Sequence, residues 1–93
     1  MPGTLVDNTA NHRFELAEPG GTAFVDYRRS GSTLILVHAE VPASLRGGGF
    51  GARLVRETLE LIRSRGETIV PACPYVRSFV DRHQEFADLV RAP

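Results

Sequence analysis

Four side chains in this sequence could move protons or attack a carbonyl carbon, and they occur as two pairs. His38 and Glu40 lie in the segment LVHAEVP, and Cys73 and Tyr75 lie in VPACPYV. An imidazole or a carboxylate can act as a general base, whereas a phenol or a thiol can act as a general acid. Cys73 could also be a nucleophile, and a position at a helix N-terminus would favour its thiolate.

Each of these residues also has a purely structural interpretation. His38 could be a hydrogen-bonded histidine at a sheet edge, and Glu40 a solvated carboxylate or the partner of an arginine. Tyr75 could pack against a helix, and Cys73 could be a small buried hydrophobe, as free cysteines often are. Three histidines and one cysteine do not form a zinc motif, so no metal site is predicted.

A run of glycines follows the first pair of candidates. Four of the nine glycines lie within five positions, in RGGGFGA at 46–52. The run could serve only to turn the chain. A Walker phosphate loop is excluded, because that loop requires a lysine after its last glycine and this chain contains no lysine. Alternatively, backbone N–H groups of the loop and of the first helical turn could bind an anion, assisted by the helix dipole.

The glycine spacing of a dinucleotide-binding fingerprint also matches this loop, but the other features of that motif do not. Gly47-x-Gly49-x-x-Ala52 has the required spacing. The acidic residue that should follow about 20 positions later, at the end of the next strand, would be Glu67, which precedes its strand. The chain is also too short for a dinucleotide-binding fold.

The hydrophobic pattern predicts a sheet that would position these residues. Apolar runs predict strands at 12–18, 22–29, 33–41 and 67–73, with a short edge strand at 4–6. Helical spacing predicts helices at 50–65 and 74–83 and a last helical turn at 85–90, with Gly66 ending the first helix and Pro74 beginning the second. The order β-β-β-α-β-α indicates an α+β fold, close to α/β, with a parallel crossover through the first helix. The 33–41 strand is expected at the centre of the sheet.

Strict alternation along the 33–41 strand assigns its side chains to two faces. The uniformly apolar face is expected to pack on the first helix, and it carries Ile35, Val37, Ala39 and Val41. The other face is expected to be open, because the first strands are joined by short turns, and it carries Leu34, Leu36, His38 and Glu40. Pro71 and Pro74 cannot donate to a ladder, so pairing between the 33–41 and 67–73 strands is expected to fail near 70–73. Pro71 could otherwise simply mark an edge strand.

The pattern Arg46-x-x-Gly49-x-Gly51 after a long strand resembles motif A of the GCN5-related N-acetyltransferases. Three segments, HAEVPASLRGGGFGARLV, VPACPYV and EFADLV, look like the small single-domain branch of that superfamily, the YjdJ-like proteins. The order of elements matches from Asn8 to the end of the chain. Ala39 departs from the threonine that is usual at that place.

The resemblance implies a minimal acyl-CoA N-acyltransferase fold that binds acetyl-CoA or coenzyme A. The pyrophosphate is expected on the glycine loop, which comprises Arg46, Gly47, Gly48, Gly49, Phe50, Gly51 and Ala52. The pantetheine arm is expected between the two splayed strands. The thioester is then expected near Glu40 and Cys73, with its carbonyl polarised by the backbone N–H of Val41.

Within that framework the candidate residues take roles in acyl transfer. Glu40 or His38 would take the proton of an amine acceptor, and Tyr75 or Cys73 would protonate the leaving thiolate. The resemblance does not identify the acceptor, which could be a small-molecule or a protein amine. A coenzyme A-binding module with little turnover and an interaction domain without a cofactor remain the alternatives.

Composition narrows the function classes further. The 93 residues predict one domain, spanning 1–93. Eleven basic residues balance eleven acidic ones without a basic block, which gives nucleic-acid binding no electrostatic support. The single cysteine fits a reducing cytoplasm. The sequence predicts neither a signal peptide nor a membrane span.

Overall fold

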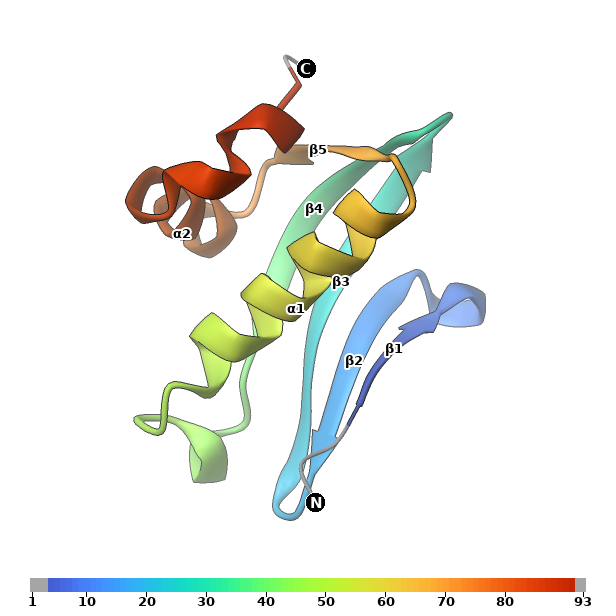
Figure 1. Cartoon of the computed structure of the whole chain (residues 1–93). Helices are drawn as coiled ribbons and strands as arrows, with labels where there is room; N and C mark the ends of the chain where they lie inside the picture. Colours follow the sequence, from blue (N-terminus) through green and yellow to red (C-terminus); the bar gives the residue numbers. More distant parts are fainter. Residues whose placement is uncertain (1–3, 92–93) are drawn as a thin grey trace.

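The computed structural model, described here for residues 4–91, is a five-stranded sheet in the order β1-β2-β3-β4-β5, crossed by one long helix (Figure 1). The strands are β1 Leu5–Asn8, β2 Arg13–Glu18, β3 Gly21–Ser30, β4 Thr33–Glu40 and β5 Thr68–Pro71. The helices are α1 Phe50–Ser64 and α2 Pro74–Arg82, with short 3-10 helices at Thr9–Asn11, Ala43–Leu45 and Gln84–Leu89. The first four strands are antiparallel neighbours, and β5 runs parallel to β4 after the α1 crossover.

The predicted elements and the α+β class are confirmed, including the edge strand near the N-terminus. The expectation that β4 is central is wrong, because β3 occupies the middle of the sheet. The β1–β2–β3–β4 chain of hairpins simply adds each strand beside its predecessor, and β5 then forms the edge next to β4.

Glycines in the left-handed region bound helix α1. Gly49 is the N-cap residue with φ +75°, and Gly66 lies just beyond the helix with φ +70°. The buried stripe of α1 comprises Leu54, Val55, Thr58, Leu59 and Ile62. This stripe packs into one core with the buried residues of the sheet and of α2.

A β-bulge in β4 changes which side chains face α1. Tyr27 of β3 is opposite Leu36, but Asp26 is opposite His38, so Val37 has no partner in the register. The extra residue reverses the alternation, since each later side chain moves to the other face. The helix-covered face therefore carries Leu34 and Leu36 before the bulge and Ala39 after it, whereas Ile35, His38 and Glu40 share the open face. The prediction that Ile35, Val37, Ala39 and Val41 face α1 is correct only beyond the bulge. The prediction that Leu34 and Leu36 lie on the open face is wrong, because both are fully buried.

The pairing of β4 with β5 ends at Pro71, as predicted. The parallel register runs from Thr33↔Thr68 to Leu36↔Pro71. The Cys73 N–H then donates to the Leu36 carbonyl at 2.8 Å, and α2 begins with Pro74 in its first position. Within residues 4–91, the rest of β4 has no strand beside it on this edge. The splay leaves backbone groups of β4 available to another molecule.

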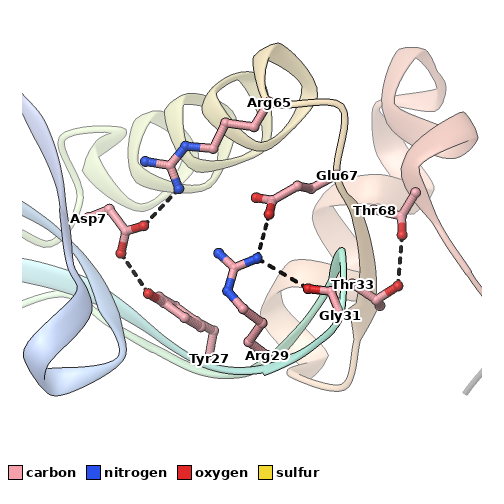
Figure 2. Close-up of polar contacts among 8 residues, drawn as sticks. All are labelled: Asp7, Tyr27, Arg29, Gly31, Thr33, Arg65, Glu67 and Thr68. Carbon is pink, nitrogen blue, oxygen red and sulfur yellow. Dashed lines mark hydrogen bonds and ion pairs between the residues drawn. The ribbon is translucent and has the colours of Figure 1, made fainter.

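A polar network fastens the other end of the sheet (Figure 2). The Tyr27 hydroxyl donates to one oxygen of Asp7 at 2.7 Å, and Arg65 donates to the other oxygen at 2.7 Å. Burial and this hydrogen bond raise the pKa of Tyr27 to about 12. Nearby, the hydroxyls of Thr33 and Thr68 lie 2.9 Å apart and align the first pair of the β4–β5 ladder. The contacts of Asp7 join β1 to β3 and to Arg65 at the C-terminal end of α1.

Residues 4–91 contain neither a membrane-spanning helix nor a cluster of metal ligands. None of the helices there combines the length and apolar character that crossing a bilayer requires. The same residues bring together no group of three metal-ligating side chains.

Candidate functional site

A cleft of about 640 Å³ lies where the end of β4, the glycine loop and α2 meet, and it is called the α1 cleft below. It brings together all but two of the sequence candidates, those absent being Gly48 and Cys73. Its lining consists of His38, Ala39, Glu40, Val41, Arg46, Gly47, Gly49, Phe50, Gly51, Ala52, Tyr75 and Arg82. Residues far apart in the chain therefore line one cleft.

The glycine loop presents unpaired backbone donors to this cleft. The first hydrogen bond of α1 joins the Arg53 N–H to the Gly49 carbonyl at 3.1 Å, so the N–H groups of Gly51 and Ala52 have no partner within the helix. Gly49 supplies no side-chain cap either. A Cβ placed on Gly47 or Gly49 would meet no atom within 4 Å, which means that the space above both is open. Open space over free N–H groups at a helix N-terminus is suited to an anion such as a phosphate.

Two arginines add positive charge to the same cleft. The Nε of Arg46 donates to the Val41 carbonyl at 3.0 Å, which ties the loop to the end of β4. Arg82 comes from the last position of α2. Within residues 4–91 neither side chain is paired with a carboxylate. The sequence analysis missed Arg82. Its spacing of seven residues from Tyr75, two turns along one face of the helix, was the available signal.

His38 and Glu40 form a pair on the open face of β4. Their Nε2 and Oε1 atoms lie 3.5 Å apart, and both side chains are more than half exposed, at 55% and 54%. The ring of Phe24, on the neighbouring strand β3, lies 6.2 Å from the imidazole. An amine that reached this edge of the cleft would meet two groups able to accept its proton.

The Tyr75 phenol rests against the first turn of α1, where a side chain on residue 51 would displace it. A Cβ on Gly51 would lie 3.0 Å from the ring carbon Cζ of Tyr75 and closer still to its hydroxyl. The side chain is 41% exposed, so it is not part of the core. Gly51 therefore lets the phenol hydroxyl lie at the N-terminal end of the helix.

The comparisons with known proteins identify the family. The model of the GCN5-related N-acetyl-transferase family matches residues 13–89. The chain belongs to this family. The solution structure of a GCN5-like protein from Staphylococcus aureus, provisionally named an N-acetyltransferase, aligns with a TM-score of 0.71 and 18% identity. The alignment covers 97% of this chain and 89% of that one, and at such low identity it establishes the shared fold alone. A search of curated proteins found no match.

Membership of the GCN5-related family does not by itself assign the roles predicted for Cys73 and Val41. Cys73 is the N-cap residue of α2, as expected from Pro74. Its side chain is only 4% exposed, belongs to the core and does not line the α1 cleft. Val41 does line the cleft. A contact of Cys73 with the acyl group, polarisation by the Val41 N–H and the YjdJ-like branch stay predictions, and the burial of Cys73 favours its structural interpretation.

Proposed function

We propose that this protein is an N-acetyltransferase that binds acetyl-CoA in the α1 cleft. The observation that carries the proposal is the uncapped, glycine-rich N-terminus of α1, which opens into the cleft with no atom within 4 Å of a Cβ on Gly47 or Gly49. The free N–H groups of the first turn suit a pyrophosphate, and the guanidinium groups of Arg46 and Arg82 add charge-assisted donors. The unpaired edge of β4 beyond Leu36 suits the amides of a pantetheine arm, which can pair with a strand as another strand would.

The side chains around the cleft then have distinct tasks. Glu40, or His38 beside it, accepts the proton that the attacking amine loses as its nitrogen bonds to the acetyl carbon. The Tyr75 hydroxyl, held near Gly51, donates a proton to the sulfur as the thioester bond breaks. The Val41 N–H polarises the carbonyl. The products are an N-acetyl amine and coenzyme A. Positioning of the two substrates is expected to supply most of the rate enhancement.

The exposure of His38 and Glu40 favours a second candidate, a coenzyme A-binding module with little turnover. Catalytic bases are usually withdrawn from solvent so that their environment can adjust their basicity, but both these side chains are more than half exposed. A bound acceptor could cover them. Binding alone does not distinguish the two candidates, whereas release of coenzyme A in the presence of amines does.

Isothermal calorimetry with acetyl-CoA, followed by a thiol-release assay with a panel of amines, tests the proposal. The expected result is binding that weakens in Arg46→Gln together with amine-dependent release of coenzyme A. Binding without release from any amine would support the binding module. If acetyl-CoA does not bind at all, both candidates are wrong.

A further inference from the structure

The arginines of this protein fall into two groups. Six pair with carboxylates, and they are Arg13, Arg29, Arg53, Arg56, Arg63 and Arg65. Within residues 4–91 the other five have no carboxylate within ion-pair distance, and they are Arg28, Arg46, Arg77, Arg82 and Arg91. Arg46 and Arg82 line the α1 cleft. Of the remaining three, Arg77 and Arg91 line a second cleft, which the proposed function does not use.

This second cleft, called the β5 cleft, has a volume of about 520 Å³ and lies beside β5. Arg77 and Arg91 line it, together with the hydroxyl residues Ser30 and Thr33 and an apolar part formed by Ile35 and Val70. Among residues 4–91, no acidic side chain lines it. Arg28 lies directly opposite Ile35 in the β3–β4 register, so its side chain is on the same face as the apolar part.

The backbone near both lining arginines is fixed. The Arg77 N–H makes the first hydrogen bond of α2, to the Cys73 carbonyl at 3.0 Å. The Arg91 N–H donates to the Ile69 carbonyl at 2.8 Å, and Val90 forms a parallel bridge with Ile69 of β5. Arg77 thus belongs to the first turn of α2, and Arg91 belongs to a segment hydrogen-bonded to β5. Arginine has a planar fork of donors that matches carboxylate and phosphate oxygens, so the ligand chemistry that fits is an organic anion with an aliphatic part.

The β5 cleft shares one face of β4 with the candidate bases. In the register with β3, Ile35, His38 and Glu40 are opposite alternate residues of β3, so all three side chains lie on the open face. The bulge at Val37 is what places them together. Ile35 and His38 are opposite Arg28 and Asp26, which are two positions apart on β3, so they lie about 7 Å apart along the strand at the usual rise per residue. A ligand extended along this face could therefore hold one end in the β5 cleft and the other beside His38 and Glu40.

We propose that the β5 cleft binds the anionic end of the acceptor, so that the acceptor is a primary amine joined by an extended aliphatic chain to a carboxylate or phosphate. This inference rests on the proposed function for its acceptor part, while the anion site stands on the geometry of the cleft. Arg77 and Arg91 bind the anion, Ile35 and Val70 contact the chain, and the amine reaches Glu40 or His38.

Binding to the protein without acetyl-CoA gives the first test. Glutarate and propyl phosphate are titrated separately while backbone amide shifts are recorded by NMR. The expected result is that one of the two perturbs the amides of Thr33, Val70 and Arg77, and that its affinity falls about tenfold or more in the Arg77→Gln/Arg91→Gln double variant. Arg56→Gln is the matched control, because Arg56 pairs with Glu85 away from the β5 cleft. If neither anion perturbs these amides, or the double variant binds as well as the control, the inference is wrong.

Acceptor preference gives the second test. Carboxylic acids with an amine at the far end of the chain, from 4-aminobutanoate to 8-aminooctanoate, are compared with alkylamines of equal length in the thiol-release assay. The corresponding aminoalkyl phosphates are compared in the same way. The best anionic amine should exceed its alkylamine in kcat/KM by about tenfold or more, and the double variant should abolish this preference while leaving the alkylamine rate unchanged. Equal rates for charged and neutral amines would refute the inference and leave the proposed function intact. Failure of acetyl-CoA to bind, with anion binding retained, would refute the proposed function and the acceptor role but not the anion site.

Discussion

Replacing Gly49 by valine tests the anion-binding loop most directly. Gly49 has φ +75°, where an L side chain costs about 1–2 kcal/mol of backbone strain. A Cβ there meets no protein atom within 4 Å, so the isopropyl group would project into the α1 cleft rather than into the core. The cost in the free energy of unfolding should therefore be the strain alone, which lowers Tm by roughly 4–8 °C per kcal/mol in a domain of this size.

The effect of Gly49→Val on binding should be separate from that strain. If the side chain denies a phosphate one charge-assisted N–H contact, worth about 1.5–3 kcal/mol, the affinity for acetyl-CoA falls about 10- to 100-fold. Calorimetry measures this loss directly. Gly31→Val is the matched control, because Gly31 has φ +61°, has equally open space and lies in the β3–β4 turn. Equal affinity in the two variants would refute the assignment of the loop as the phosphate site.

Three further predictions follow from single contacts. Gly51→Ala should displace the Tyr75 hydroxyl and lower kcat with little change in Tm, and Tyr75→Phe should lower kcat similarly with no further loss in the double variant. The raised pKa of Tyr27, about 12 against 10.0, means that the protonated phenol stabilises the fold fully below pH 10. The free energy of unfolding should therefore fall as pH rises from 10 to 12, a loss that Tyr27→Phe removes in urea titrations. Cys73, at 4% exposure, should react slowly with iodoacetamide until the protein is denatured, and Cys73→Ser should retain turnover within about tenfold. Rapid native labelling slowed by acetyl-CoA would instead restore its role at the acyl group.

The elements that were predicted correctly depend on local signals. Gly66 and Pro74 end and begin helices through their own backbone properties, and both lie where the sequence placed them. The end of the β4–β5 ladder followed from the missing donor of Pro71. The glycine loop lies between a strand and a helix and lines the α1 cleft because sequence order alone sets that position.

The wrong predictions concern features that depend on how one segment of the chain packs beside another. The bulge at Val37 arises from the register between β3 and β4, and the period-two pattern of one strand contains no information about it. The central position of β3 depends on the order in which hairpins add to the sheet, which a hydrophobic run in β4 does not reveal. The β5 cleft could not be predicted at all, because it joins residues from the β3–β4 hairpin, β5, α2 and the C-terminal segment.

The distribution of charge over the surface likewise could not be predicted from the sequence, and it bears on function. Eleven basic and eleven acidic residues without a basic block suggest a neutral surface. In the fold, six arginines are neutralised by carboxylates, whereas Arg46 and Arg82 lie in one cleft and Arg77 and Arg91 in another. A protein with zero net charge thus presents two separate positive sites, because most of its acidic side chains pair with other arginines. The second site, which the proposed acetyl-CoA site does not use, is the feature on which the proposal of a charged acceptor rests.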